Sequence, residues 1–554
     1  MKNLKTSNLV FCDIETDGLD ATTIWCAVCR HNGINEVICN GRDFKAYAES
    51  RQDKTWVFHN GIGFDVPVLA DIWGVTFDRT RVVDTLVLSR LADPSRTGGH
   101  SLRNWGNTLG FLKGDHDDWS QLTPNMIDYC MRDAELTEAV YKKLAIELYD
   151  FSQESIDLEH QVQWVIQEQQ RHGWLLDQRL CHSLCAKFKE RMYEIEEELQ
   201  RVFPPVVEER WSEKTQKRLK DKVTIFNPGS RQQVAERLEA KGAVWSLLTP
   251  SGRPQVDEKT LEENKHIPEA VLVLEYLLVQ KRYAQVSSWI EHVQDDGRVH
   301  GRVTTNGAIT GRMTHQNPNM AQVPSVNSEF GKECRDCWIV PEGRKLVGVD
   351  ASGLELRMLA HYMGDKEFID VLLREDIHTR NQIAAGLATR AEAKTFIYAF
   401  LYGAGDAKIG SIVGGTAKDG HELRTRFLRN TPALETLRIR IGQEASGGII
   451  SGLDGRRLWV RSQHSALNTL LQAAGAIVMK KALVILDDYA RRNNFDFNFV
   501  GNIHDEIQSE VAAEQAEKFG WFAVECIKAA GVSFKLQCPL DGEYRVGETW
   551  AQTH

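Results

Sequence analysis

Two stretches far apart in the chain decide its fold: DASGLELRMLAHY at residues 350–362 and GNIHDEIQSE at residues 501–510. Asp350 follows an apolar run that reads as a strand, and Asp505 and Glu506 fall in the turn that we expect between two further strands. Carboxylates at strand ends pack poorly but bind divalent cations well, because hard cations prefer anionic oxygen. If the hairpin folds against Asp350, these acids can hold two metal ions that clamp an in-line phosphoryl displacement. Taken alone, Asp350 fits an ordinary surface acid equally well.

The stretch TRAEAKTFIYAFLYGAG at residues 389–405 has the pattern of a helix between the two acidic stretches. Arg390, Lys394 and Tyr398 recur every four residues and therefore share one helical face. Two cations and a ring on one face suit a triphosphate with its sugar and base. A solvated charged stripe is the alternative, but it does not explain why the face continues into Tyr402.

A second acidic set lies near the N-terminus. Asp13 and Glu15 alternate with Ile14 in FCDIETDGL, so on a strand both carboxylates face the same side. Asp65 follows in VFHNGIGFDVPVL and Asp133 in YCMRDAE. Each acid alone reads as a surface residue. Together, with Tyr129 one helical turn before Asp133, they indicate a second metal site.

Composition indicates a multidomain globular protein. The chain has 554 residues with 42% apolar and 26% charged side chains, enough for three or four domains of about 150 residues. No apolar run approaches the roughly 20 residues of a membrane helix, and the N-terminus lacks a signal-peptide pattern. Cys26 and Cys29 form a CxxC without a second pair, so the eleven cysteines read as reduced thiols. The net charge of −10 does not exclude nucleic acid, because a channel needs only local positive potential.

The order of patterns divides the chain. Residues 1–147 alternate strands and helices, which predicts a mixed α/β sheet. Helical periodicity then dominates to about residue 295 and suggests a helical arm, in which the basic stretch 209–222 fits a solvated helix face. Strands return at KLVGVD and at DFNFVGNIHDEIQSEV, separated by mainly helical sequence.

These motifs resemble those of a known family. DASGLELR, RAEAKTFIYAFLYGAG and HDE, in this order, resemble motifs A, B and C of family A (DNA polymerase I-like) DNA polymerases, closest to phage replicative enzymes of the podovirus type. The resemblance extends through TTNGAITGRMTHQNPNMAQVP, DIHTRNQIA and GLDGRRLWVRSQHSALNTLLQAAGAIV. The N-terminal acids with their tyrosine resemble DEDD-type 3′–5′ exonucleases of the ribonuclease H-like fold.

The polymerase resemblance implies a role for each matching residue. Asp350 and Asp505 are expected to hold the two catalytic metal ions, supported by Glu506. The expected dNTP contacts are Glu355, His378, Arg390, Lys394 and Tyr398. Glu355 would exclude a ribose 2′-hydroxyl, and tyrosine at 398 implies ready acceptance of dideoxynucleotides. The helix carrying Arg390 would close over a matched base pair.

Expected DNA contacts are Arg312, Tyr402, Asn468, Gln472 and His504. Donors at the minor groove check the shape of a base pair without reading its sequence. For Asn468 and Gln472, capping or core hydrogen bonding is the alternative. In the exonuclease site, Asp13, Glu15, Asp65 and Asp133 are expected to bind two metal ions. Tyr129 would orient the attacking water, and Asn60 would contact the substrate.

The implied fold is multidomain α/β and α+β: a ribonuclease H-like exonuclease domain followed by a right-hand polymerase. The expected domains are exonuclease (1–147), thumb and connecting helices (148–300), first part of the palm (301–361), fingers and adjoining helices (362–495) and second part of the palm (496–554). The expected metal is Mg²⁺, two per active site, with Mn²⁺ as a substitute, because carboxylate sites that leave room for phosphates suit it.

The expected partners are primer–template DNA, dNTPs and an unidentified helicase, primase or processivity factor. Some phage relatives recruit host thioredoxin through a long thumb insertion; here only residues 175–225 lie between Trp174 and Phe226, which argues against that partner. The basic stretch from Lys214 to Lys222 is expected to contact the duplex backbone instead. No 5′-nuclease domain is expected ahead of Asp13, and the expected location is a bacterial host cytoplasm without membrane association.

Two alternatives belong to other functional classes. One is a DNA-binding scaffold with an inactive polymerase site. The other is a 3′–5′ exonuclease whose C-terminal part only holds DNA. Intact Asp350, Asp505, Glu506 and Lys394 argue against the scaffold, and Tyr398 and Glu355 would have no purpose in the exonuclease alternative. Both alternatives predict no nucleotide incorporation.

Overall fold

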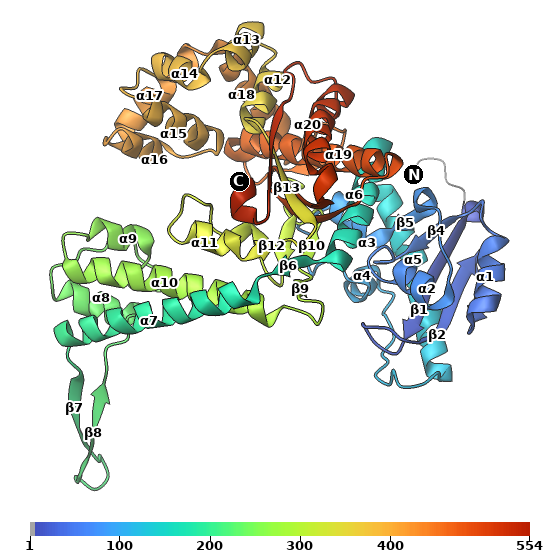
Figure 1. The fold of residues 1–554 in the computed structure, drawn as a ribbon, viewed down its shortest axis with the longest axis horizontal. Coiled ribbons are helices and arrows are strands. Elements are labelled where there is room, and N and C mark those ends of the chain that lie inside the picture. The colour runs from blue at the N-terminus through green and yellow to red at the C-terminus, as the bar shows by residue number, and fades with distance from the viewer. Residues whose placement is uncertain (1–5) are drawn as a thin grey trace.

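The computed structural model describes residues 6–554 and consists of a sheet domain, a helical arm and a larger lobe built on a second sheet (Figure 1). The first sheet has the order β3-β2-β1-β4-β5, with β2 antiparallel to β1 and β3, and β4 parallel to β1 and β5. Its strands are β1 (Leu9–Thr16), β2 (Ile24–His31), β3 (Ile34–Ile38), β4 (Thr55–Phe58) and β5 (Val82–Asp84). The mixed sheet expected for the N-terminal residues is confirmed.

Helices cover both faces of this sheet. They are α1 (Gly41–Glu49), α2 (Asp65–Trp73), α3 (Thr85–Ala92), α4 (Leu102–Leu109) and α5 (Pro124–Glu147). Alternation along β1 sends Val10 and Cys12 into the core under α1 and α2, and Leu9 and Phe11 into the core under α3, α4 and α5. Asp13 points to the same side of β1 as Leu9 and Phe11 and therefore faces α5. This helix carries two other predicted site residues, Tyr129 and Asp133.

The middle of the chain forms the arm. It contains β6 (Trp174–Leu176), α7 (Gln178–Val202), β7 (Val206–Trp211), β8 (Arg218–Thr224), α8 (Arg231–Glu239), α9 (Glu258–Glu263) and α10 (Pro268–Glu291). Helix α6 (Gln153–His172), which precedes the arm, packs instead in the hydrophobic core of the larger lobe. Helices α7 and α10 pack along each other, and the β7–β8 hairpin projects from the far end (Figure 1). Ser230 caps α8, since its side chain accepts from Gln233 N.

The helix expected for residues 209–222 is wrong, because this stretch forms most of the β7–β8 hairpin. Lysine and arginine dominate the stretch and are good helix formers. However, two prolines precede it, and Val206, Val207, Trp211 and Val223 are residues that favour strands. Every residue of β7 is exposed, so the hairpin is held by strand pairing rather than by a core.

The second sheet has the order β16-β17-β13-β18, with all neighbours antiparallel. The strands of this region are β9 (Arg298–Val299), β10 (Arg302–Thr304), β11 (Thr314–Gln316), β12 (Trp338–Ile339), β13 (Arg344–Ala351), β16 (Phe497–Ile503), β17 (Glu506–Ala512) and β18 (Gly542–Gly547). The hairpin expected around residue 505 is present. Only His504 and Asp505 form its turn, however, because Glu506 already pairs with Asp350 as the first residue of β17.

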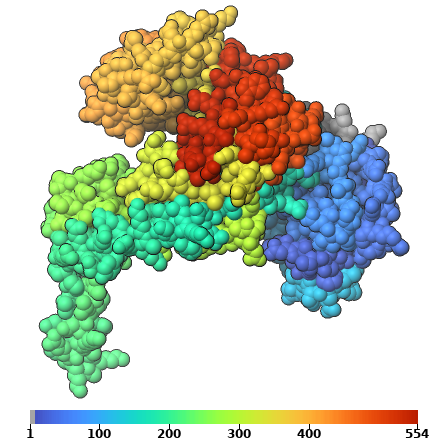
Figure 2. Space-filling model, in the orientation of Figure 1, coloured from blue at the N-terminus to red at the C-terminus, as the bar shows by residue number. Residues whose placement is uncertain are grey.

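Helices complete the larger lobe; they pack around one hydrophobic core, except α11, which packs in the core at the base of the arm. They are α11 (Gly331–Asp336), α12 (Leu354–Met363), α13 (Lys366–Arg374), α14 (Ile377–Ala385), α15 (Arg390–Leu401), α16 (Asp406–Ile412), α17 (Ala417–Arg429), α18 (Pro432–Glu444), α19 (Ala466–Arg492) and α20 (Ala516–Ser533), with the hairpin β14 (Ile449–Ser451) and β15 (Arg457–Trp459) between α18 and α19. Figure 2 shows an open cleft between the lobe of α13–α17 and the arm.

Among residues 6–554, one helical segment, Gln463–Arg492, is long and apolar enough to cross a membrane by length and composition. It contains α19, and 78% of its most apolar window is buried inside the protein, as expected for a core helix.

A buried charge cluster holds α6 against the β14–β15 hairpin and α19. Arg456 contacts Asp454 and Glu159, both at 2.6 Å, and Lys480 contacts Glu159 at 2.7 Å. All four side chains are at most 2% exposed. Because a buried charge without a partner is costly, this cluster fixes α6, the β14–β15 hairpin and α19 relative to one another.

We expect Arg456→Met to lower the free energy of unfolding by about 3–5 kcal/mol, because it leaves the Asp454 carboxylate buried without its cation. Arg457→Met is the matched control: Arg457 pairs with Asp150 at the surface, where ion pairs contribute about 0–1 kcal/mol. Denaturant unfolding of both variants measures the difference, and equal effects would contradict the role of the cluster.

Candidate active sites

The first candidate site is formed by three neighbouring strands of the second sheet. Asp350 on β13 lies opposite Glu506 on β17 and Glu543 on β18. Ala351 N donates to Asp505 O at 3.3 Å, which holds the turn of the β16–β17 hairpin against β13. The structure therefore brings Asp350, Asp505 and Glu506 together as predicted, although they are far apart in sequence.

The environments of two of these acids differ. Burial, followed by Asp505 and Glu506, raises the pKa of Asp350 to about 7. Glu506 is 6% exposed, and burial alone would raise its pKa. Hydrogen bonds from His554, Gln508 and Trp550 instead lower the pKa of Glu506. Glu506 thus stays ionised beside an Asp350 that readily holds a proton.

The sequence analysis did not identify any of these three hydrogen-bond donors to Glu506. Trp550 Nε1 donates to Glu506 Oε1 at 2.7 Å, His554 Nδ1 lies 3.3 Å from Glu506 Oε2, and Gln508 also donates to Glu506. The Arg335 guanidinium lies 3.9 Å from the same carboxylate. Among these donors only Gln508 could have been found from the sequence, because it lies two residues from Glu506 on the same strand and therefore on the same side.

Helix α15 carries the predicted cationic face. Lys394 is exposed, and the rings of Tyr398 and His378 lie 6.2 Å apart. Arg390 is not free: its Nη2 donates to Asp376 Oδ1 at 3.1 Å, and its Nε donates to the same carboxylate. Any anion that binds Arg390 must therefore replace or share Asp376.

Glu355 lies at the centre of a second contact set. It lies in the first turn of α12 and accepts from the Tyr402 hydroxyl at 2.7 and 2.6 Å and from Arg312 Nη2 at 3.2 Å. The Tyr398 and Tyr402 rings stack 6.3 Å apart. Arg312 and Tyr402, predicted DNA contacts, are thus tied to a predicted dNTP contact.

The remaining predicted DNA contacts lie nearby. Asn468 and Gln472 are partly buried and one turn apart on α19. His504 is exposed in the β16–β17 turn with φ +59°, a left-handed conformation that is uncommon for histidine. Arg312 lies close enough to His504 to lower its pKa, second to burial.

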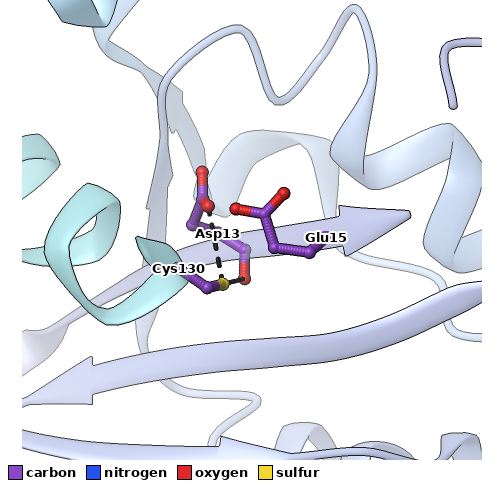
Figure 3. A group of neighbouring side chains, drawn as sticks. All are labelled: Asp13, Glu15 and Cys130. Atoms are coloured by element: carbon purple, nitrogen blue, oxygen red, sulfur yellow. Dashed lines mark hydrogen bonds between the residues drawn. The ribbon is translucent and has the colours of Figure 1, made fainter. Parts of the chain in front are cut away.

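The second candidate site lies on the first sheet. Asp13 and Glu15 point to the same side of β1, and ligand atoms of Asp13, Glu15 and Cys130 lie within 4.8 Å of one another (Figure 3). Cys130 Sγ donates to Asp13 O at 3.4 Å and to Asp13 Oδ2 at 3.5 Å. Cys130 follows Tyr129 on α5 and was not singled out from the sequence.

The other two predicted ligands complete this site. Asp65 begins α2 and is 6% exposed; Asp133 on α5 is 2% exposed. Burial, followed by repulsion from Asp133, raises the pKa of Asp13 well above its ordinary range and that of Glu15 to about 9. Burial raises the pKa of Asp65 to about 7.

Asn60 lies beside these carboxylates in a strained turn after β4. It is exposed with φ +66°, and its backbone N–H donates to Asp84 Oδ1 at 2.9 Å. Ile62 N donates to Asp84 Oδ2 at 3.1 Å. Asp84, 1% exposed and missed in the sequence, therefore shapes the turn that carries Asn60 and leads to Asp65.

The donor set of the second site fits divalent metal ions. Carboxylates that repel one another are stabilised by a hard cation with oxygen ligands. Asp133 Oδ1 is buried and has no hydrogen-bond partner. Such an orphaned anionic oxygen is costly unless something binds it, so it is available as a metal ligand.

Comparison with known proteins identifies the family. A family model described as DNA polymerase family A matches residues 197–552. The chain belongs to this family. As a member of DNA polymerase family A it is a DNA polymerase, and the resemblance found in its motifs is confirmed; enzymes of this family use divalent metal ions.

Its similarity to phage enzymes covers nearly the whole chain. The chain is 32% identical to the DNA-directed DNA polymerase of Escherichia phage T7, over 99% of this chain and 100% of the relative. It is also 32% identical to that of Enterobacteria phage T3, over 92% of this chain and 95% of the relative. A solved structure, the POL domain of Pol1 from M. smegmatis in complex with DNA primer-template and dNTP, matches with a TM-score of 0.83 at 19% identity, covering 99% of this chain and 97% of that chain. The expected multidomain α/β and α+β fold is confirmed.

We expect Glu15→Gln to stabilise the metal-free protein increasingly as pH rises from 5 to 9. The pKa of Glu15 is about 9 in the folded chain against 4.5 ordinarily. The folded state therefore binds a proton that the unfolded state has released, and stability falls as pH rises through this window. Thermal unfolding with a chelator measures the difference. Asp17→Asn, at an exposed acid with a lowered pKa, is the control whose effect should stay constant; a constant effect of Glu15→Gln would contradict the argument.

Proposed function

We propose that this chain is a phage replicative DNA polymerase that extends a primer 3′ end from dNTPs and removes mispaired ends with its own 3′–5′ exonuclease. One observation carries the polymerase assignment: Asp350 is held opposite Glu506, with Asp505 in the adjoining turn, by antiparallel strand pairing. That arrangement suits two metal ions next to the cationic face of α15.

Asp350 and Asp505 would hold the metal ions, with Glu506 in support. Mg²⁺ fits best, since this carboxylate set leaves room for substrate phosphates, and Mn²⁺ can substitute. When bound, the ions supply charge neutralisation for the attacking 3′-hydroxyl and for the leaving pyrophosphate.

The side chains around the carboxylates would select and orient the nucleotide. Arg390, Lys394 and His378 bind the triphosphate, and Arg390 exchanges Asp376 for phosphate as it does so. Tyr398 lies by the incoming sugar. Glu355, held in place by Tyr402 and Arg312, would block the space that a ribose 2′-hydroxyl needs.

The exonuclease site would use Asp13, Glu15, Asp65 and Asp133 as ligands for two further metal ions. Tyr129 orients the attacking water, and Asn60, exposed at its turn, contacts the terminal nucleotide. Repulsion among the carboxylates, which follows burial as a cause of the raised pKa values of Asp13 and Glu15, makes binding of divalent cations favourable.

The partners that fit are primer–template DNA and dNTPs, both named for the M. smegmatis structure. Asn468, Gln472 and His504 contact the duplex near the primer end. We assign residues 1–147 to the exonuclease, 148–300 to thumb and connecting helices, 301–361 and 496–554 to the palm, and 362–495 to the fingers. A phage enzyme of this kind acts in the bacterial host cytoplasm, with a helicase or primase still to be identified.

We expect Asp505→Ala to reduce primer extension by at least about 1000-fold, because several kcal/mol of charge stabilisation is lost. It should leave degradation of single-stranded 3′ ends intact. Asp13→Ala with Glu15→Ala should do the reverse and raise the misincorporation frequency. A labelled-primer gel measures both activities, and each variant is the matched control for the other.

Equal loss of both activities in the Asp505→Ala variant would contradict the assignment of two separate sites. Degradation by the wild-type chain without any extension would favour the exonuclease alternative. Unchanged misincorporation in the Asp13→Ala, Glu15→Ala variant would mean that the exonuclease does not proofread.

A further inference from the structure

The second candidate site contains a cation supplied by an ordered segment. Lys113 lies between α4 and α5, in a stretch without helix or strand. Arg132 Nε donates to Leu112 O at 3.0 Å, and Trp25 Nε1 donates to Trp119 O at 3.0 Å. The backbone is thus fastened on both sides of Lys113, which presents its side chain to the site from a fixed position.

The Lys113 ammonium contacts two predicted site residues at once. Its Nζ lies 2.6 Å from Asp133 Oδ2 and 4.8 Å from the centre of the Tyr129 ring, and it hydrogen bonds to the Tyr129 side chain. Tyr129 and Asp133 are one turn apart on α5, so a single cation bridges them. Burial opposes the charge, but Asp133 raises the pKa of Lys113, which keeps the ammonium protonated.

The contact with Lys113 makes the two carboxylate oxygens of Asp133 different. Oδ2 accepts from Lys113, whereas Oδ1 is buried and has no hydrogen-bond partner. A carboxylate that is hydrogen bonded through one oxygen presents the other to a metal ion in a fixed orientation. Lys113 therefore sets which oxygen of Asp133 is available.

The same contact defines the role of the Tyr129 hydroxyl. An ammonium has donors and no acceptor, whereas a phenol has one donor and acceptor lone pairs. When Lys113 donates to the hydroxyl oxygen, the phenol O–H remains free to donate elsewhere. Gly114, next to Lys113, allows the segment to approach the ring, since a Cβ there would lie 3.3 Å from Tyr129 Cδ2.

We propose that Lys113 is a positioning residue of the exonuclease site, which orients Asp133 toward the metal ion and fixes the Tyr129 hydroxyl as a donor. This inference rests on the proposed exonuclease function. A simple counter-charge would need to contact only a carboxylate. The bridge to Tyr129 and the anchored segment give Lys113 an orienting role as well.

The test compares Lys113→Met, which removes the charge but keeps the length, with Lys113→Arg, which keeps the cation. Lys142→Met is the control, because Lys142 is an exposed lysine on α5 that pairs with Glu138. Single-turnover degradation of a labelled single-stranded oligonucleotide measures the exonuclease rate. Calorimetric titration with Mn²⁺, on chains that also carry Asp505→Ala, measures metal binding at this site independently of activity.

We expect Lys113→Met to lower the exonuclease rate by about 10–100-fold and to weaken Mn²⁺ binding by about 10-fold or more, as loss of a ligand's hydrogen-bond partner does. Lys113→Arg should restore part of both. Tyr129→Phe added to Lys113→Met should cost little more than the larger single change, because both act through one hydroxyl.

A wild-type rate and affinity in Lys113→Met would overturn the inference. The inference would also be overturned if Lys113→Met lowered the exonuclease rate without changing Mn²⁺ affinity and if the losses of rate from Lys113→Met and Tyr129→Phe multiplied fully in the double variant. A wild-type chain that degrades no DNA would instead contradict the proposed exonuclease. In that case the Mn²⁺ titration still decides whether Lys113 orients Asp133.

Discussion

Repulsion between carboxylates that the fold forces together is the constraint on which both sites depend. Strand pairing places Asp350 against Glu506, and alternation along β1 places Asp13 beside Glu15. Like charges at such spacing favour protonation or a bound cation. Burial, followed by this repulsion, raises the pKa values of Asp350 and Glu15. A divalent ion relieves it, so the same strain that costs stability favours metal binding.

The fold offsets the repulsion differently in the two sites. In the first, donors around Glu506 come from Trp550, Gln508 and His554, so this acid stays ionised and Asp350 holds the raised pKa. In the second site, the Lys113 ammonium pairs with the buried Asp133 carboxylate. Trp550 also packs on Trp174, 5.0 Å away, in the core at the base of the arm. Packing at the base of the arm therefore positions Trp550, which donates a hydrogen bond to Glu506 in the first site.

Polar contacts connect the domains that carry the two sites. Asn306 Nδ2 donates to Arg90 O at 3.0 Å, and Trp459 Nε1 donates to Ala92 O at 3.1 Å, both across the boundary between the sheet domain and the larger lobe. The buried cluster of Arg456 and Glu159 lies at the same junction. In the proposed function, a primer end would move from one site to the other.

The sequence predicted what local periodicity encodes. Alternation placed Asp13 and Glu15 on one side of a strand, and a four-residue repeat placed Arg390, Lys394 and Tyr398 on one face of α15. The sequence-based prediction failed where local signals conflicted. At 209–222 the basic residues suggested a helix, but the preceding prolines and the strand-favouring valines and tryptophan led to a β-hairpin.

Partners brought in by distant packing could not be predicted. The Asp376 partner of Arg390 lies on another segment, and Trp550 reaches Glu506 only through the tertiary fold. Lys113 lies in a segment without any periodic pattern, so only the structure reveals that it contacts Asp133. Residue types and order were thus sufficient to single out the acids that the fold brings together, whereas the groups that change their pKa values became visible only in the fold.

The most direct measurement is a gel of a labelled primer on a template with Mg²⁺ and the wild-type chain, with and without dNTPs. Two separate metal sites in one chain predict that the primer grows when dNTPs are present and shortens when they are absent. A primer that only shortens, or that is bound and left unchanged under both conditions, would contradict the account.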